Sequence, residues 1–187
     1  MKIVAGKHRS RIINSIESNT TRPTASKIKE AVFSKIGPYF AGGTMLDLFA
    51  GSGSIGLEGI SRGIEHCYFF DNNSEAIKMI NSNITNLHEE NTCSVFKLDY
   101  KASLKYCLNN NLKFDIIYLD PPYLEQEIAY IMEFIATNKL LNTDGYIVVE
   151  SLKNDSFGDN YSDIYKLKES KYGITKITYY RKDEEDE

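Results

Sequence analysis

Between residues 44 and 61 the chain contains three segments in succession: a short apolar run ending in an aspartate, a glycine-containing loop and a helix-forming segment. Gly51, Gly53 and Gly56 have the spacing GxGxxG, and Asp71 lies twenty residues beyond Gly51. Glycine lets the backbone approach a ligand closely, and the start of the following helix presents unpaired N–H groups. The arrangement predicts a site for an adenosine-type cofactor and leaves open whether the cofactor is NAD or S-adenosylmethionine.

The chain around this loop alternates between strand-like apolar runs and amphipathic helical segments. We expect strands at 45–49, 67–71, 94–99, 114–120 and 145–150, and helices at 54–63, 74–87, 101–109 and 125–137. Such alternation predicts a mostly parallel α/β sheet with helices on both faces. Two further strand-like runs, 165–170 and 174–181, predict a closing antiparallel hairpin, which is typical of the Rossmann-like fold of S-adenosylmethionine-dependent methyltransferases.

The first forty residues predict a separate extension. Residues 2–4 and 11–13 indicate a small β-hairpin, and a helix is expected from Thr24 or Ser26 to about residue 36, where Gly37-Pro38 ends it. We therefore divide the chain into an extension at 1–40, a methyltransferase-like domain at 41–182 and an acidic tail at 183–187.

Charge is distributed unevenly along the chain. The formal net charge is −4, yet residues 1–40 contain eight Lys and Arg against two acidic residues. A basic extension on an acidic body is the asymmetry expected of a protein that binds a polyanion. The alternative is a lysine-rich face that is merely solvated.

Other sites are not indicated. Cys67, Cys93 and Cys107 are widely separated and form no ligand-like spacing with the three histidines, so we expect neither a metal site nor disulfides. The apolar runs are too short to span a membrane, and the first residues lack an apolar signal core, so cytoplasmic localisation is expected.

Acidic residues at strand ends favour S-adenosylmethionine. Asp47, at the end of the first strand, could face the methionine ammonium, Asp71 the ribose hydroxyls, and Asp99 the adenine amino group. The alternative for Asp99 is the N-cap of the following helix, and Asp71 could likewise cap the helix that begins near Ser74.

The segment Asp120-Pro121-Pro122-Tyr123 follows the fourth strand, at the edge where ligands bind in open α/β sheets. An exocyclic base amine is a weak nucleophile, and the Asp120 carboxylate and the Pro121 carbonyl could accept both of its hydrogens. The prolines fix the carbonyl, and Tyr123 offers a ring on which an extruded base could stack. The alternative is a rigid turn without chemistry.

Four segments resemble one family, the bacterial RsmD-type guanine-N2 methyltransferases of 16S ribosomal RNA: KIVAGKHRSRII, TRPTASKIKEAVFSKI, LDLFAGSGSIGLEG and IIYLDPPY. The resemblance implies S-adenosylmethionine as cofactor and 16S rRNA as partner, within a small-subunit particle or assembly intermediate. It implies that Asp120, Pro121, Pro122 and Tyr123 form the base pocket. The cofactor residues that it implies are Asp47, Phe49, Gly51, Gly53, Asp71, Asn72, Asp99 and Tyr100. The RNA contacts that it implies are Lys7, Arg9, Arg11, Arg22 and Lys27.

Three rival functions stay open. A DNA adenine-N6 methyltransferase would use the same chemistry but needs a target-recognition domain, for which the chain has little room. An NAD(P)-dependent oxidoreductase would use the glycine loop, but no catalytic set of residues accompanies it. A non-enzymatic RNA-binding or ribosome-assembly protein would not need Asp120.

Overall fold

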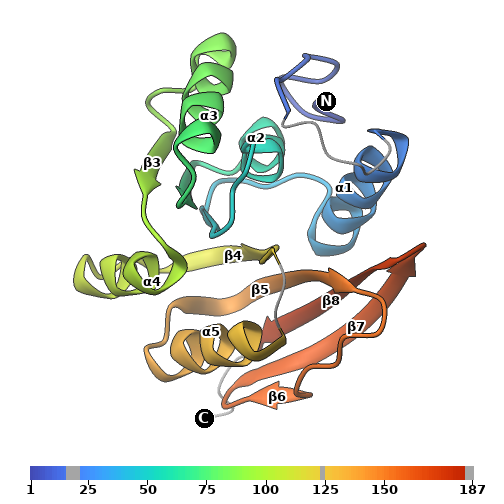
Figure 1. Cartoon of the computed structure of the whole chain (residues 1–187), viewed down its shortest axis with the longest axis vertical. Helices are drawn as coiled ribbons and strands as arrows, with labels where there is room; N and C mark the ends of the chain where they lie inside the picture. Colours follow the sequence, from blue (N-terminus) through green and yellow to red (C-terminus); the bar gives the residue numbers. More distant parts are fainter. Residues whose placement is uncertain (16–21, 123–124, 184–187) are drawn as a thin grey trace. The chain divides into compact units, whose positions relative to one another are not determined.

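The structure is a computed structural model that describes residues 1–15, 22–122 and 125–183, without the side chains of residues 22–24 and 125–126 (Figure 1). The chain divides into two compact units, Met1–Tyr100 and Lys101–Glu187.

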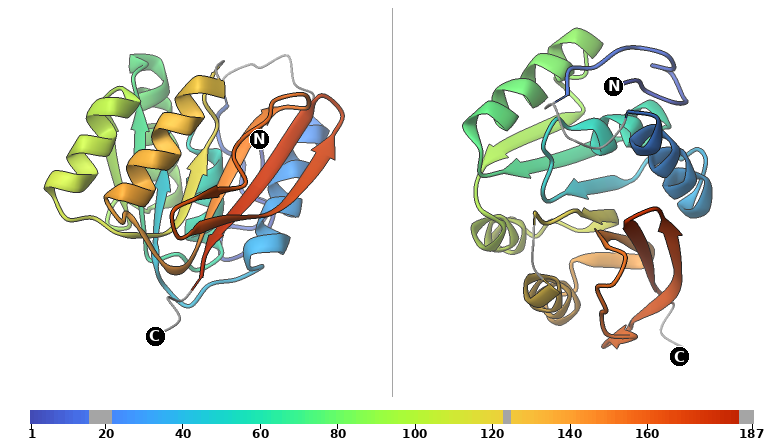
Figure 2. Two further views of the ribbon diagram at one scale, coloured as in Figure 1. Left: turned by 90° about the horizontal axis from the view of Figure 1, so that it is seen from below. Right: turned by 45° about the vertical axis from the view of Figure 1, so that its right-hand side comes forward.

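The first unit contains three parallel strands in the order β3-β2-β1. Its elements are α1 (Arg22–Ile36), β1 (Thr44–Asp47), α2 (Ser54–Ser61), β2 (His66–Asp71), α3 (Ser74–Leu87) and β3 (Cys93–Lys97). Asp47 is in register with Phe69, and Asp71 with Lys97, so the carboxyl ends of the strands meet at one edge. Helix α2 packs on β1 and β2, and α3 packs on β2 and β3 (Figure 2).

Residues 1–13, here called the N-terminal arm, form the predicted hairpin, but with less strand pairing than expected. Lys2 and Ile12 make an isolated antiparallel bridge, and the Ile3 N–H donates to the Arg11 carbonyl at 3.0 Å. The tip is a turn in which Arg9 N–H donates to the Gly6 carbonyl at 3.1 Å. Ile3 and Ile13 are buried, so the arm contributes two side chains to the core.

The second unit contains a mixed sheet in the order β4-β5-β8-β7-β6. Its elements are α4 (Tyr100–Asn109, whose first residue belongs to the first unit), β4 (Phe114–Leu119), α5 (Glu125–Thr137), β5 (Leu141–Leu152), β6 (Asn160–Tyr161), β7 (Ile164–Tyr172) and β8 (Thr175–Lys182). Strands β4 and β5 are parallel, whereas β5, β8, β7 and β6 pair antiparallel. Gly173, with φ of 61°, turns the chain between β7 and β8.

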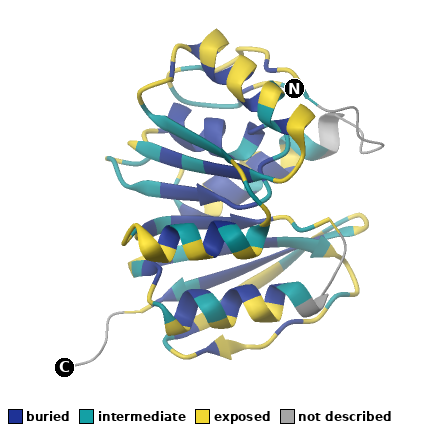
Figure 3. Cartoon of the chain, turned by 60° about the vertical axis from the view of Figure 1, so that its left-hand side comes forward, coloured by how far each residue is buried: buried dark blue, intermediate teal, exposed yellow. Residues whose placement is uncertain are grey.

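Apolar side chains are buried in both units because the strands are covered by helices. In the first unit Met45, Leu46 and Phe69 are fully buried, and in the second α5 turns Ile131 and Ile135 inward while its other side is exposed (Figure 3). Burial of such side chains removes roughly 1.5–3 kcal/mol of unfavourable hydration each.

The predicted alternation and the closing hairpin are confirmed, and α3 and α5 have the expected bounds. The first helix begins at Arg22, slightly earlier than expected, and the two-residue strand β6 was not predicted because it is too short to have a pattern.

Candidate functional site

The glycine loop joins β1 to α2 through left-handed backbone. Gly51 has φ of 57°, and Gly53, the N-cap residue of α2, has φ of 79°. A Cβ added to Gly51 would meet no heavy atom within 4 Å, so there is free space beside this backbone. The loop therefore has the close backbone approach and the open helix N-terminus that an adenosine-type cofactor needs.

Gly56 has a different role from the first two glycines. A Cβ at Gly56 would lie 2.3 Å from Cε1 of Phe69 and 2.6 Å from Sγ of Cys67. The third glycine of the motif thus allows α2 to pack directly on β2, which is its expected role in this loop.

Asp47 is almost completely buried at the end of β1, with 2% of its surface exposed. Its Oδ2 accepts a hydrogen bond from the Gly56 N–H at 3.2 Å. Burial raises the pKa of the Asp47 carboxyl to about 7, because water no longer stabilises the charged form. A ligand cation next to this side chain would keep it ionised, which fits the predicted ammonium contact.

Asp71 connects the second strand to the loop. Its Oδ2 accepts from the Gly51 N–H at 2.9 Å, and its Oδ1 accepts from the Asn73 N–H at 2.8 Å. Asp71 does not cap α3; that alternative is wrong. Asn73 is the N-cap, since its side chain accepts from the N–H groups of Glu75 and Ala76. The half-buried Asp71 carboxylate retains lone pairs for a ribose, and Asn72 beside it is exposed.

Two aromatic residues predicted to bind cofactor meet although they are distant in sequence. The ring centroids of Phe49 and Tyr100 are 6.0 Å apart, with 39° between the ring planes, and both residues are half-buried. Asp99 is exposed directly before α4, a position that suits both an adenine contact and a helix cap. Both interpretations of Asp99 therefore stay open.

The predicted base-binding segment follows β4. Asp120 is exposed, Pro121 is half-buried and Pro122 is exposed, while Tyr123 lies outside the described residues. Leu119, the last residue of β4, is in register with Val149 of β5, so Asp120 lies at the carboxyl edge of the parallel strands of the second unit. This is the edge at which the sequence places it.

The predicted RNA contacts differ in their surroundings. Arg9 and Lys27 are exposed. Lys7 is also exposed but forms an ion pair with Glu89 at 2.5 Å, and the Arg11 Nη2 donates to the Asn86 carbonyl at 2.8 Å. The side chain of Arg22 lies outside the described residues. The basic extension therefore presents several cations to solvent.

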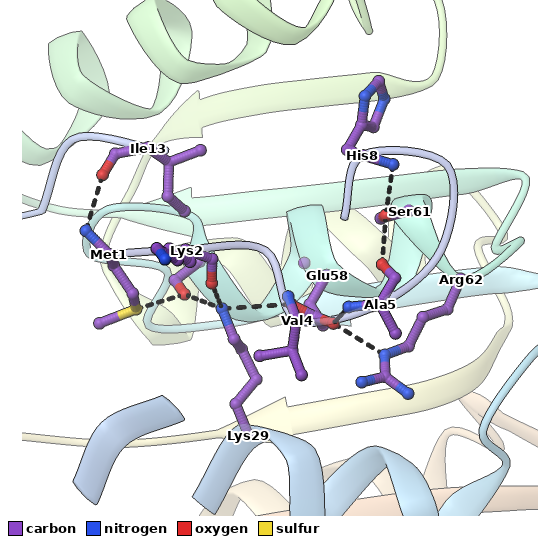
Figure 4. A network of polar contacts seen from close by, with 12 residues as sticks. Met1, Lys2, Val4, Ala5, His8, Ile13, Lys29, Glu58, Ser61 and Arg62 are labelled. Atoms are coloured by element: carbon purple, nitrogen blue, oxygen red, sulfur yellow. Dashed lines mark hydrogen bonds and ion pairs between the residues drawn. The ribbon is translucent and has the colours of Figure 1, made fainter. Parts of the chain in front are cut away.

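Lys29, in contrast, requires a correction. The sequence predicts that the basic residues of the extension, of which Lys29 is one, bind a polyanion or are solvated, yet Lys29 is 1% exposed. Its Nζ lies 3.2 Å from Oε2 of Glu58 and donates to the Lys2 carbonyl and to Oγ of Ser54 (Figure 4). Burial lowers the pKa of Lys29, and the neighbouring Glu58 carboxylate partly offsets this. Lys29 is thus an internal counter-ion.

Glu58 is the functional candidate that the sequence reasoning missed. It is completely buried, and Arg62, at 4% exposure, donates to its Oε1 from Nε at 2.8 Å. The available signal was an acidic residue in the middle of the otherwise small and apolar helix SIGLEGIS. Acidic residues are rarely buried unless they are paired.

A protein-family model described as "Conserved hypothetical protein 95" matches residues 1–181. The chain belongs to this family. The resemblance to the RsmD family predicted from the sequence is thereby confirmed. The Bacillus subtilis protein named "Putative rRNA methyltransferase YlbH" is 36% identical over 182 residues, which cover 97% of this chain and 99% of the relative. "Ribosomal RNA small subunit methyltransferase D" of Haemophilus influenzae is 28% identical over 187 residues, covering 97% and 93%.

Two solved structures have a fold similar to that of this chain. "Putative methyltransferase yhhF" from Escherichia coli superimposes with a TM-score of 0.83 at 20% identity, over 98% of each chain. SMU.776, solved in complex with SAH, gives a TM-score of 0.66 at 14% identity, over 82% of this chain and 49% of that one. The predicted methyltransferase variant of the Rossmann-like fold is confirmed.

Within the described ranges, no cluster of three or more His, Cys, Asp or Glu side chains is arranged to hold a metal ion. No helix in the same residues has the length and apolar character needed to cross a membrane.

Proposed function

We propose that this chain is an S-adenosylmethionine-dependent methyltransferase that modifies the exocyclic N2 amine of a guanine in 16S ribosomal RNA. The observation that carries the proposal is the exposed Asp120 carboxylate at the end of β4, followed by two prolines. The names of the relatives support rRNA as the substrate class, and the SAH-bound structural neighbour supports the cofactor. The choice of guanine N2 rests on the RsmD resemblance.

The first unit offers the groups that this cofactor requires. We propose that Asp47 faces the ammonium of the methionine part and that Asp71, with Asn72, faces the ribose. The free space beside Gly51 would admit the cofactor against the backbone. Phe49, Gly53, Asp99 and Tyr100 would complete the contacts. When bound, S-adenosylmethionine supplies an electrophilic methyl group on a sulfonium.

Asp120 and Pro121 would act on the acceptor amine. The carboxylate and the Pro121 carbonyl would accept hydrogen bonds from the two N–H groups of the amine, which would orient its nitrogen lone pair for attack. The Asp120 carboxylate would stabilise the positive charge that develops on the acceptor nitrogen and would accept the amine proton that is released. Pro122 restricts the backbone, and Tyr123 would stack on the extruded base.

We further propose that residues 1–40 form an RNA-contacting extension of the methyltransferase domain at 41–182, which precedes the acidic tail at 183–187. Lys7, Arg9, Arg11, Arg22 and Lys27 would contact phosphates, which position RNA without reading its sequence. The acceptor would be a small-subunit particle or assembly intermediate.

Incubation with methyl-labelled S-adenosylmethionine tests the proposal. The acceptors are small-subunit particles lacking the modification, naked small-subunit rRNA, large-subunit rRNA and duplex DNA, each also incubated with Asp120→Ala. N2-methylguanosine from a small-subunit acceptor, absent with the variant, is the expected result. N6-methyladenine in DNA would instead indicate a DNA adenine-N6 methyltransferase. If no acceptor is labelled, the proposed substrate is wrong.

A further inference from the structure

Helix α2 has two faces with different partners. Gly56 and Gly59 allow it to pack on the strands, since a Cβ at Gly59 would lie 2.7 Å from Sδ of Met45. Glu58 and Ser61 lie on another face and hold the N-terminal arm (Figure 4). The helix that begins at the cofactor loop therefore also carries the basic arm.

The Glu58 carboxylate accepts four hydrogen bonds. Two come from the arm, from the N–H groups of Val4 at 2.9 Å and Ala5 at 3.0 Å. The other two come from the cations Lys29 and Arg62. A carboxylate has about four lone-pair positions for donors, so all are used, and no neutral side chain of this size can replace it.

Ser61 forms a second attachment one turn later. Its Oγ accepts from the His8 N–H at 2.9 Å and donates to the Ala5 carbonyl at 2.6 Å. Its carbonyl accepts from the Lys7 N–H at 2.8 Å. A Cβ at Gly6 would overlap this carbonyl, 1.8 Å away, so the arm backbone lies directly on α2.

These contacts fix where the arm displays its cations. Lys7 and Arg9 are exposed in the turn of the arm, whose backbone is hydrogen-bonded to Glu58 and Ser61 of α2. Lys29, in contrast, is buried and paired with Glu58. We infer that Glu58 is a positioning residue for the RNA acceptor: it holds the arm on α2 so that Lys7 and Arg9 meet phosphates in a fixed place. This inference rests on the proposed function, because it assumes that the arm contacts RNA.

Two variants and one control test the role of Glu58. Glu58→Gln removes the buried charge and replaces one acceptor oxygen with an N–H donor. Ser61→Ala loosens the same arm without leaving a buried cation unpaired, and so decides the question if Glu58→Gln does not fold. Glu30→Gln, an identical change at an exposed position of α1, is the control.

The readouts separate the arm from the rest of the fold. We expect faster hydrogen exchange at the N–H groups of Val4 and Ala5 in Glu58→Gln, and at His8 in Ser61→Ala. We expect the rRNA KM of Glu58→Gln to rise roughly tenfold, because misplaced phosphate contacts no longer orient the acceptor. The kcat at saturating rRNA and the Kd for S-adenosylhomocysteine should stay within about twofold. Glu30→Gln should match the wild type.

Two results would overturn the inference. One is an unchanged rRNA KM despite faster exchange in the arm, since the arm would then not position RNA. The other is a parallel loss of kcat, cofactor affinity and acceptor affinity, which would mean that Glu58 only stabilises α2. If the wild type binds rRNA but transfers no methyl group, the proposed function fails, and the Kd of each variant for rRNA still decides the role of Glu58.

Discussion

The Oδ2 atom of Asp47 accepts a hydrogen bond from the backbone N–H of Gly56 at 3.2 Å, so the end of β1 is joined to the first turn of α2. Because Asp47 is otherwise buried, its pKa is raised to about 7. The proposed ammonium contact and the stability of the protein without cofactor both depend on the charge of this one side chain, in opposite directions.

Cofactor affinity should therefore depend on pH near neutrality. Below about pH 7 Asp47 becomes protonated in the unbound protein, so the Kd for S-adenosylhomocysteine should rise, approaching about tenfold per pH unit. Calorimetric titration between pH 6 and 8 measures this. The control is 5′-methylthioadenosine, which lacks the ammonium and should bind with little pH dependence. A flat Kd for S-adenosylhomocysteine would contradict the role of Asp47.

Asp47→Asn should stabilise the protein without cofactor at alkaline pH. The folded pKa is raised from 3.8 to about 7, so the stability contributed by protonated Asp47 is complete below about pH 4 and is lost as pH rises through 7. The variant should gain up to about 4 kcal/mol in unfolding free energy at pH 8 and much less at pH 5. Urea unfolding at both values measures the gain. Equal stability at pH 8 would argue against a buried charge.

The glycines of the loop should separate stability from binding. Gly56→Ala forces a Cβ against Phe69 and Cys67, so we expect a loss of roughly 1–3 kcal/mol in unfolding free energy. Gly51→Ala meets no neighbour and carries only the cost of left-handed backbone, about 1–2 kcal/mol, but its Cβ occupies the space beside the loop. Its main effect should be weaker binding of S-adenosylhomocysteine, measured by calorimetry beside thermal unfolding of both variants. Intact cofactor affinity in Gly51→Ala would place the cofactor elsewhere.

Asp120→Asn should remove activity and leave the fold intact. The amide cannot supply the second acceptor and the negative charge, so kcat for rRNA should fall at least about a hundredfold. Since Asp120 is exposed, the unfolding free energy should change by less than about 0.5 kcal/mol. Glu133→Gln, an exposed site on α5, serves as the matched control. Near-normal turnover in Asp120→Asn would show that Asp120 is not a catalytic residue.

RNA binding should depend on salt through the arm. Removing one phosphate contact with Arg9→Ala should lower the slope of log K against log salt by about 0.7–1. Lys78→Ala, at an exposed position of α3 paired with Glu75, should leave the slope unchanged. Filter binding to an rRNA fragment at several salt concentrations measures both slopes. Equal slopes for Arg9→Ala and the wild type would remove Arg9 from the interface.

The α/β architecture and the order of the candidate site residues along the chain can be predicted from local sequence patterns. Buried parallel strands need continuous apolar runs, and the loops at their carboxyl ends need glycine, proline and acidic residues, so the local pattern places Asp47, Asp71 and Asp120 at strand ends. These features are local, and neighbouring residues are enough to specify them.

The burial and the partners of individual charged side chains could be seen only in the folded chain. Lys29 is a solvated lysine by local pattern, but Glu58 from another helix makes its burial possible. Asn73 rather than Asp71 caps α3, because the Asp71 carboxylate accepts a hydrogen bond from Gly51 in the glycine loop. This contact joins segments that are twenty residues apart, so the local pattern does not reveal it. The pKa of Asp47 depends on how much water the packed fold excludes. The charge state and burial of such a side chain depend on its partners and on its access to water, and both are set by residues from distant parts of the chain.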